Sequence, residues 1–95
     1  MGKHKFKITV EHLEDQKGSP ANDPPLVFLA ENHDDILALA ARTGASGDKD
    51  RAFLVGLKLL GEVLLEDRNN PLYHDFIPHF GEFMKRIKQS RTSPG

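Results

Sequence analysis

Two stretches near the start of the chain alternate between apolar and polar positions and predict β-strands. In residues 5–12, KFKITVEH, every second residue from Phe6 to Val10 is apolar, and Lys7 and Thr9 lie between them. Such alternation is typical of a strand with one face buried and the other in water. Residues 25–31, PLVFLAE, predict a second strand in which the alternation is weaker.

The two predicted strands are joined by a polar run, residues 14–24, that contains a glycine and two prolines. This composition predicts a long surface loop rather than a tight hairpin turn. We expect antiparallel pairing, because a parallel pair would need a longer crossover. On that pairing Val27 and Leu29 lie on the outer face, beside Lys5 and Lys7.

Helical periodicity begins after the second strand. We expect Asn32 to cap a helix that ends at Gly44, a residue typical of helix termini. Residues 44–47 form a linker, and Asp48 is the expected N-cap of a central helix that runs to about Asp67.

The central helix contains the most apolar part of the chain, residues 52–65, AFLVGLKLLGEVLL, in which Lys58 and Glu62 are the charges. We therefore expect neighbouring elements to cover it on nearly every side. Gly56 and Gly61 each cost about 1 kcal/mol relative to alanine inside a helix. We expect at least one of them to mark a helix crossing, and Gly56→Leu to destabilise the fold strongly.

The last apolar pattern begins at Asn70-Pro71, a pair typical of a helix start, and runs to about Gln89. Pro78 lacks the amide that would bond to the carbonyl of residue 74, so we expect a kink or a break between Tyr73 and Pro78. A short connection at 68–70 makes this helix antiparallel to the central one.

The expected fold is therefore α+β: an antiparallel two-stranded ribbon with three helices packed on one face, in the order ββααα. Residues 1–95 form a single domain, with an ordered core of about 3–89 and a frayed tail of 90–95. The chain has no cysteine, so disulfides and thiolate metal sites are excluded. No signal peptide is recognised and the central apolar run is too short to span a bilayer, so we expect a soluble cytoplasmic protein without membrane contact.

Charge is distributed unevenly along the chain. The two ends carry seven basic residues and no acid, whereas the middle carries six basic residues and fourteen acids. The basic residues of the ends are Lys3, Lys5, Lys7, Lys85, Arg86, Lys88 and Arg91. If the ends meet in space, they form a basic patch that could contact phosphates.

No catalytic signature is present, and we expect neither an enzyme nor a cofactor. The five histidines lack the spacing of a zinc site, and we expect no metal. His33 is interpreted as a solvated residue at a helix start, and a site shared by His74, His79 and Asp75 remains an alternative of low weight. The Gly44–Gly47 linker resembles a phosphate-clamping loop, but Asp48 and Asp50 follow it and favour a generic linker.

Three segments carry a resemblance to a known family: AENHDDI at 30–36, VGLKLLGEVLLEDRNNPL at 55–72 and FGEFMKRIK at 80–88. Over residues 5–88 the chain resembles a small bacterial family of uncharacterised single-domain proteins. The resemblance implies no established activity and no site residues. It does imply a suggested nucleic-acid-binding role that rests on structural modelling.

Two functions follow as hypotheses. The first is a non-enzymatic binding module that contacts nucleic acid through the basic residues of the first strand and last helix. The second is a protein-interaction or homodimerising adaptor domain that uses the sheet edge or the outer face, with Val27 and Leu29 at the interface.

Overall fold

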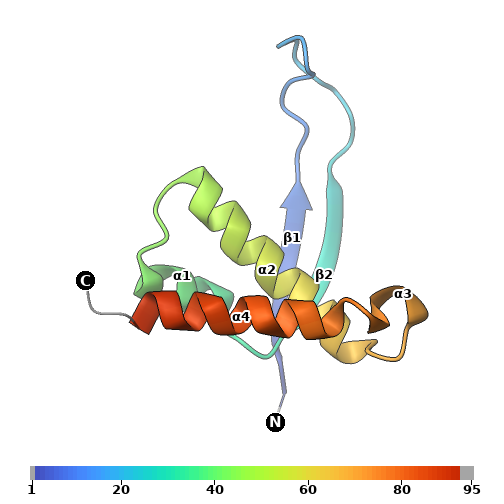
Figure 1. Ribbon diagram of the computed structural model, residues 1–95. Helices are drawn as coiled ribbons and strands as arrows, with labels where there is room; N and C mark the ends of the chain where they lie inside the picture. Colours follow the sequence, from blue (N-terminus) through green and yellow to red (C-terminus); the bar gives the residue numbers. More distant parts are fainter. Residues whose placement is uncertain (1, 93–95) are drawn as a thin grey trace.

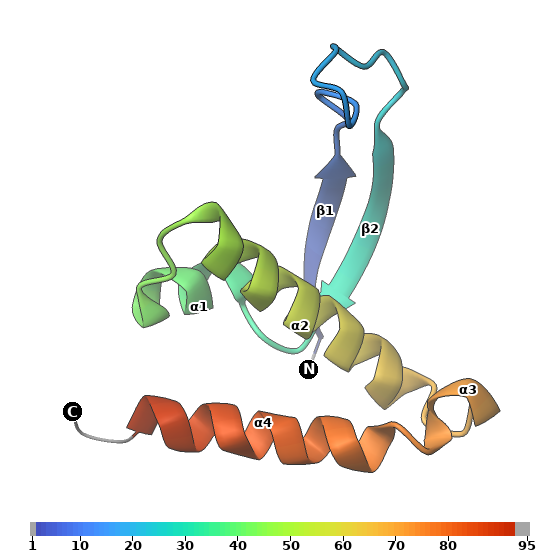
Figure 2. The same ribbon diagram turned by 45° about the horizontal axis from the view of Figure 1, so that its top comes forward.

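The computed structural model describes residues 2–92, and side chains through residue 90. Its elements are β1 (His4–Val10), β2 (Leu26–Asn32), α1 (Ile36–Thr43), α2 (Asp48–Glu66), α3 (Pro71–His74) and α4 (Ile77–Thr92). The hairpin of β1 and β2 stands out from a layer of helices like an arm, and α2 crosses its base (Figure 1). Turning the molecule shows α4 returning along the far side of α2 (Figure 2). The fold is α+β, as the sequence predicted.

The strands pair antiparallel, as expected, and Ile8 lies opposite Phe28 in the register. Because paired residues share a face, Lys7 and Leu29 lie on the outer face, whereas Ile8 and Phe28 lie on the inner one. The helical layer covers the base of the inner face. Near the tip, Val10 and Leu26 remain more than half exposed.

The connection between the strands is organised by Asp15, whose side chain accepts hydrogen bonds from the amides of Lys17 and Ser19 at 2.9 Å. Gly18 supplies the positive φ of 83° that this turn needs. The long surface loop expected at 14–24 therefore contains a hydrogen-bonded turn and extends the arm beyond the strands.

Helix α1 is capped by Asp35, which accepts from the amide of Ala38, and not by Asn32 as we expected. Asn32 is instead buried at the end of β2, where its Nδ2 donates to the carbonyl of Lys58 at 2.9 Å. Its side chain therefore ties the sheet to α2. The helix ends at Gly44, as predicted, in a left-handed conformation with φ 72°.

The expectation that Asp48 caps the central helix is wrong by one residue, because α2 includes Asp48 and Gly47 precedes it as the cap. Gly61 faces α4: a Cβ placed there would lie 3.3 Å from the ring of Phe80. A Cβ at Gly56 would meet nothing within 4 Å. Within one chain, therefore, the approach of α4 explains Gly61 and no clash supports the expected loss of stability in Gly56→Leu.

The predicted last helix is two helices, so the described chain has four helices rather than three and the exact ββααα layout is not confirmed. The expected break is present between His74, the end of α3, and Ile77, the start of α4. Pro78 accounts for it, because its ring has no amide to donate back to residue 74. At the other end α4 continues past Gln89 to Thr92, so residues 90–92 are helical rather than frayed, and 93–95 lie outside the described part.

Candidate binding surface

The basic residues predicted to form a patch lie on two elements. Lys5 and Lys7 are exposed on the outer face of β1, and Lys85, Arg86 and Lys88 are exposed along α4. The side chain of Arg91 lies outside the described part. In both ribbon views the end of α4 lies apart from the start of β1 (Figures 1 and 2).

Lys3 and Lys85 are engaged by carboxylates of the same chain. Lys3 Nζ lies 3.2 Å from Glu62 Oε2 and also pairs with Glu66. Lys85 Nζ lies 3.8 Å from Glu82 Oε2, one helical turn away. The hydrogen bond from Lys3 to Glu66 raises the pKa of Lys3, and Glu62 adds to that effect although partial desolvation opposes it. Lys3 therefore stabilises the contact of the first strand with α2.

Glu62 is the centre of a polar cluster between β2 and α2. It is 9% exposed, and its Oε1 accepts from the backbone amide of His33 at 3.2 Å. Its Oε2 lies 2.9 Å from His33 Nδ1 but receives no well-directed hydrogen bond. Burial alone would raise the pKa of Glu62, but the hydrogen bonds from His33 and the neighbouring Lys3 ammonium outweigh burial and lower that pKa.

The sequence did not predict this cluster. Its members are Lys3, His33 and Glu62, which are far apart along the chain, and His33 was interpreted as merely solvated. No spacing rule links these positions, because the end of β2 brings His33 to α2 only in the fold. The pair of charges Lys58 and Glu62, four residues apart on an otherwise apolar helix, was the available signal.

The other candidate surface is a bare apolar face centred on α2. Contrary to our expectation, neighbouring elements cover only part of residues 52–65. Among the side chains that the structure describes, the buried apolar ones are Ile36, Leu54 and Leu64. Phe53, Leu60 and Val63 on the same helix are 43–47% exposed. The helices that follow α2 are too few to cover both of its sides, and the arm extends beyond it.

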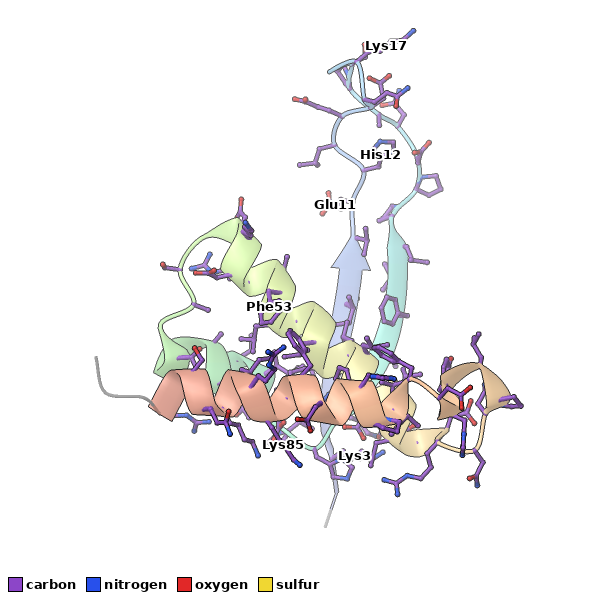
Figure 3. All side chains as sticks on the ribbon, viewed as in Figure 1. Lys3, Glu11, His12, Lys17, Phe53 and Lys85 are labelled. Carbon is purple, nitrogen blue, oxygen red and sulfur yellow. The ribbon has the colours of Figure 1, made fainter. Side chains whose placement is uncertain are left out.

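The bare side of α2 is continuous with exposed aromatic residues on both of its neighbours. Val63 shares a hollow of about 360 Å³ with Phe28 of β2. On the other flank, the rings of Phe53 and Phe83 of α4 meet edge to face at 6.2 Å beside a hollow of about 510 Å³. Figure 3 shows Phe53 on α2, on the body of the molecule, and Lys17 far away at the arm tip. We call Phe28, Phe53, Leu60, Val63 and Phe83 the apolar face.

The residues predicted for an interface, Val27 and Leu29, are 46% and 80% exposed. The register places them on the outer face of β2, with Lys7 opposite Leu29. Leu29 also borders the hollow between β2 and α2 that contains Val63. The sequence thus identified exposed apolar residues of the arm, but not the larger apolar face.

A smaller hollow of about 240 Å³ lies beside the polar cluster, with Phe80 and Met84 at its apolar side. On its rim Lys58 Nζ pairs with Asp34 Oδ2 at 2.7 Å. Within residues 2–90, no three histidine or acidic side chains gather closely enough to hold a metal ion. None of the helices described in the structure has the length and apolar character needed to cross a membrane.

Comparisons with known proteins give a family but no activity. The family DUF3861, described as a domain of unknown function with a solved structure, matches residues 4–89. A crystal structure of a protein of unknown function from Pectobacterium atrosepticum is similar at 33% sequence identity, with a TM-score of 0.75. The similarity covers 94% of this chain and 99% of that chain. No curated protein matches the chain.

Proposed function

Since this chain belongs to the DUF3861 family, to which no function is assigned, we propose from its apolar face that it is a non-enzymatic protein-association module. The observation that carries the proposal is the exposed area. The chain exposes 7891 Å², whereas a compact monomer of this mass exposes about 5,500 Å². An excess of this size, together with exposed large apolar side chains such as Phe53, Leu60 and Val63 on one helix, is typical of a surface that another protein covers.

The dimensions of the chain support the same conclusion. The radius of gyration is 16.0 Å, compared with about 12 Å for a compact domain of this length. The arm contributes to this difference, because its tip packs against no helix of the same chain (Figure 1). A two-stranded hairpin is marginally stable alone in water. A partner that packs against Phe28 at the inner face of the arm and against α2 would therefore stabilise both.

The polar cluster supports a structural rather than a catalytic role. Glu62 is held by Lys3 and His33, and all three residues join the base of the arm to α2. We assign the cluster the task of fixing the arm in place, so that Phe28 and Val63 present one continuous surface.

Site-specific photo-crosslinking in the producing cells tests the proposal. A photoreactive amino acid at position 53 should give an adduct of one discrete mass, and the same group at position 17 on the arm tip should not. If the adduct contains a different protein, that protein must bind the purified chain saturably. It must not bind the Leu60→Asp variant of the chain. Adduct yields that are equal at positions 53 and 17 would overturn the proposal.

A second candidate function, contact with nucleic acid, is favoured by one observation. Lys5 and Lys7 are both exposed and lie on the same outer face of β1. Phosphate contacts there would be sensitive to salt and weakly specific for sequence. The engagement of Lys3 and Lys85 by carboxylates makes this candidate weaker than protein association.

A further inference from the structure

We propose that the partner on the apolar face is a second copy of this chain, and that the two α2 helices cross at Gly56. This inference rests on the proposed association function and names its partner. In such a dimer a two-fold axis passes near Gly56, so each copy presents the same face to the other.

The geometry of α2 defines the contact. Phe53, Gly56, Leu60 and Val63 follow one another at intervals of three and four residues and so form one stripe of the helix. All four are exposed, and none of them carries a charge or a hydrogen-bonding side chain. The stripe is flanked by Phe28 of the arm and Phe83 of α4, which would pack against the second copy on either side.

The area favours a permanent partner of this kind. Each chain exposes about 2,400 Å² more than a compact monomer of its mass. Obligate homodimers bury about 2,000–5,000 Å² in total, shared between the two copies, and their interfaces are more apolar than transient ones. The excess on two chains falls within that range. A second copy also supplies a matching apolar face at equal concentration, and the net charge of −1 per chain gives little repulsion.

Gly56 supplies the independent observation. A glycine inside a helix costs about 1 kcal/mol relative to alanine. The ring of Phe80 accounts for Gly61, but nothing in the described part of the chain accounts for Gly56. A glycine at the centre of an exposed apolar stripe allows another backbone to approach closely. A crossing of two copies at this point gives that glycine a packing role.

Light scattering on the purified chain is the first test. We expect a mass of twice 10.6 kDa at micromolar concentration, and Gly56→Leu should raise the dissociation constant at least tenfold. Gly81→Leu is the matched control, because Gly81 is also an exposed helical glycine with nothing within 4 Å of its Cβ. That variant should remain a dimer.

Disulfide trapping is the second test. Because the chain has no cysteine, any disulfide must form through the introduced residue. Gly56→Cys should oxidise to a covalent dimer, because the two-fold axis brings both copies of the residue together. Gly81→Cys should not. A dimer that survives Gly56→Leu and gives no Gly56→Cys disulfide would overturn the crossing at this residue.

The results also separate this inference from the proposed function. In one outcome the purified chain is a monomer, but position 53 still gives a discrete adduct with another protein that passes the binding test above. That outcome would overturn the proposal of a homodimer and leave the proposed association function standing. A monomeric chain without such an adduct would overturn both. A dimer that depends on Gly56 supports both.

Discussion

The two sides of α2 differ in what they contact, although both are apolar. On one side Leu54 and Leu64 are buried, and Gly61 admits the ring of Phe80. On the other side Phe53 and Leu60 are almost half exposed, and Gly56 faces open space. The comparison teaches that an apolar sequence pattern predicts burial of a helix face. It does not say whether the same chain or a partner chain buries that face. The following predictions test whether the two sides differ in this way.

The largest difference is expected between two leucines of α2. Leu54→Ala removes a buried side chain and should lower the free energy of unfolding by about 2–4 kcal/mol. Leu60→Ala should cost less within one copy, because Leu60 is 43% exposed there. Denaturant titrations at several protein concentrations check this: the deficit of Leu60→Ala relative to the unmodified chain should shrink on dilution, because the unmodified chain then also loses its second copy, whereas the deficit of Leu54→Ala should not. Equal losses that do not depend on concentration would contradict the contrast.

Asn32 tests the connection between the sheet and the packed side of α2. Asn32→Ala leaves the Lys58 carbonyl and the Asp34 amide without their side-chain partner. Loss of such buried hydrogen bonds should cost about 1–3 kcal/mol, measured by thermal unfolding. Asn69→Ala is the control, because Asn69 is an exposed residue of the α2–α3 connection. Similar melting temperatures for the two variants would show that Asn32 does not tie the sheet to α2.

Glu62 makes the stability of the packed side of α2 depend on pH. Because the pKa of Glu62 is lowered in the fold, its stabilising effect is present above the unfolded value of about 4.5 and is lost as the pH falls through the folded pKa. Glu62→Gln should therefore cost about 1 kcal/mol near neutral pH and progressively less in acid. Unfolding titrations between pH 3 and pH 7 measure the difference. A gap between variant and unmodified chain that does not narrow in acid would argue against this role.

The smallest effect on stability is expected from the basic residues. Replacing Lys5, Lys7, Arg86 and Lys88 together by glutamate should change the free energy of unfolding by about 1 kcal/mol or less, because the side chains are exposed. If these residues contact nucleic acid, the same variant should lose binding to an oligonucleotide at low salt, measured by fluorescence anisotropy. Unchanged binding would remove nucleic acid from the candidate functions.

Local signals predicted much of this fold. Alternation located both strands, and their antiparallel pairing followed from a connection too short for a parallel crossover. The break before α4 followed from one covalent fact, the missing amide of Pro78. Gly44 ended α1 for an equally local reason, since glycine adopts a left-handed conformation without strain.

The sequence-based predictions were wrong where contacts between residues distant in the sequence decide the structure. Asn32 has the side chain of a helix cap, but burial against the Lys58 carbonyl engages it and leaves capping to Asp35. Coverage of residues 52–65 also depended on the whole fold, because it requires knowing how far the arm and α4 reach. The polar cluster of Lys3, His33 and Glu62 could not be predicted, since its charges meet only after the sheet has docked.

The contacts within one copy have a consequence for folding kinetics. β1 pairs with the next strand along the chain, and α1 packs on the helix that follows it. Contacts between neighbours in sequence form quickly, so each chain should reach its own structure in a first-order step. Under the two-copy arrangement a slower, second-order step follows. The rate of that association step in refolding experiments should rise in proportion to chain concentration. Until it occurs, the apolar face of a newly made chain stays exposed and can aggregate.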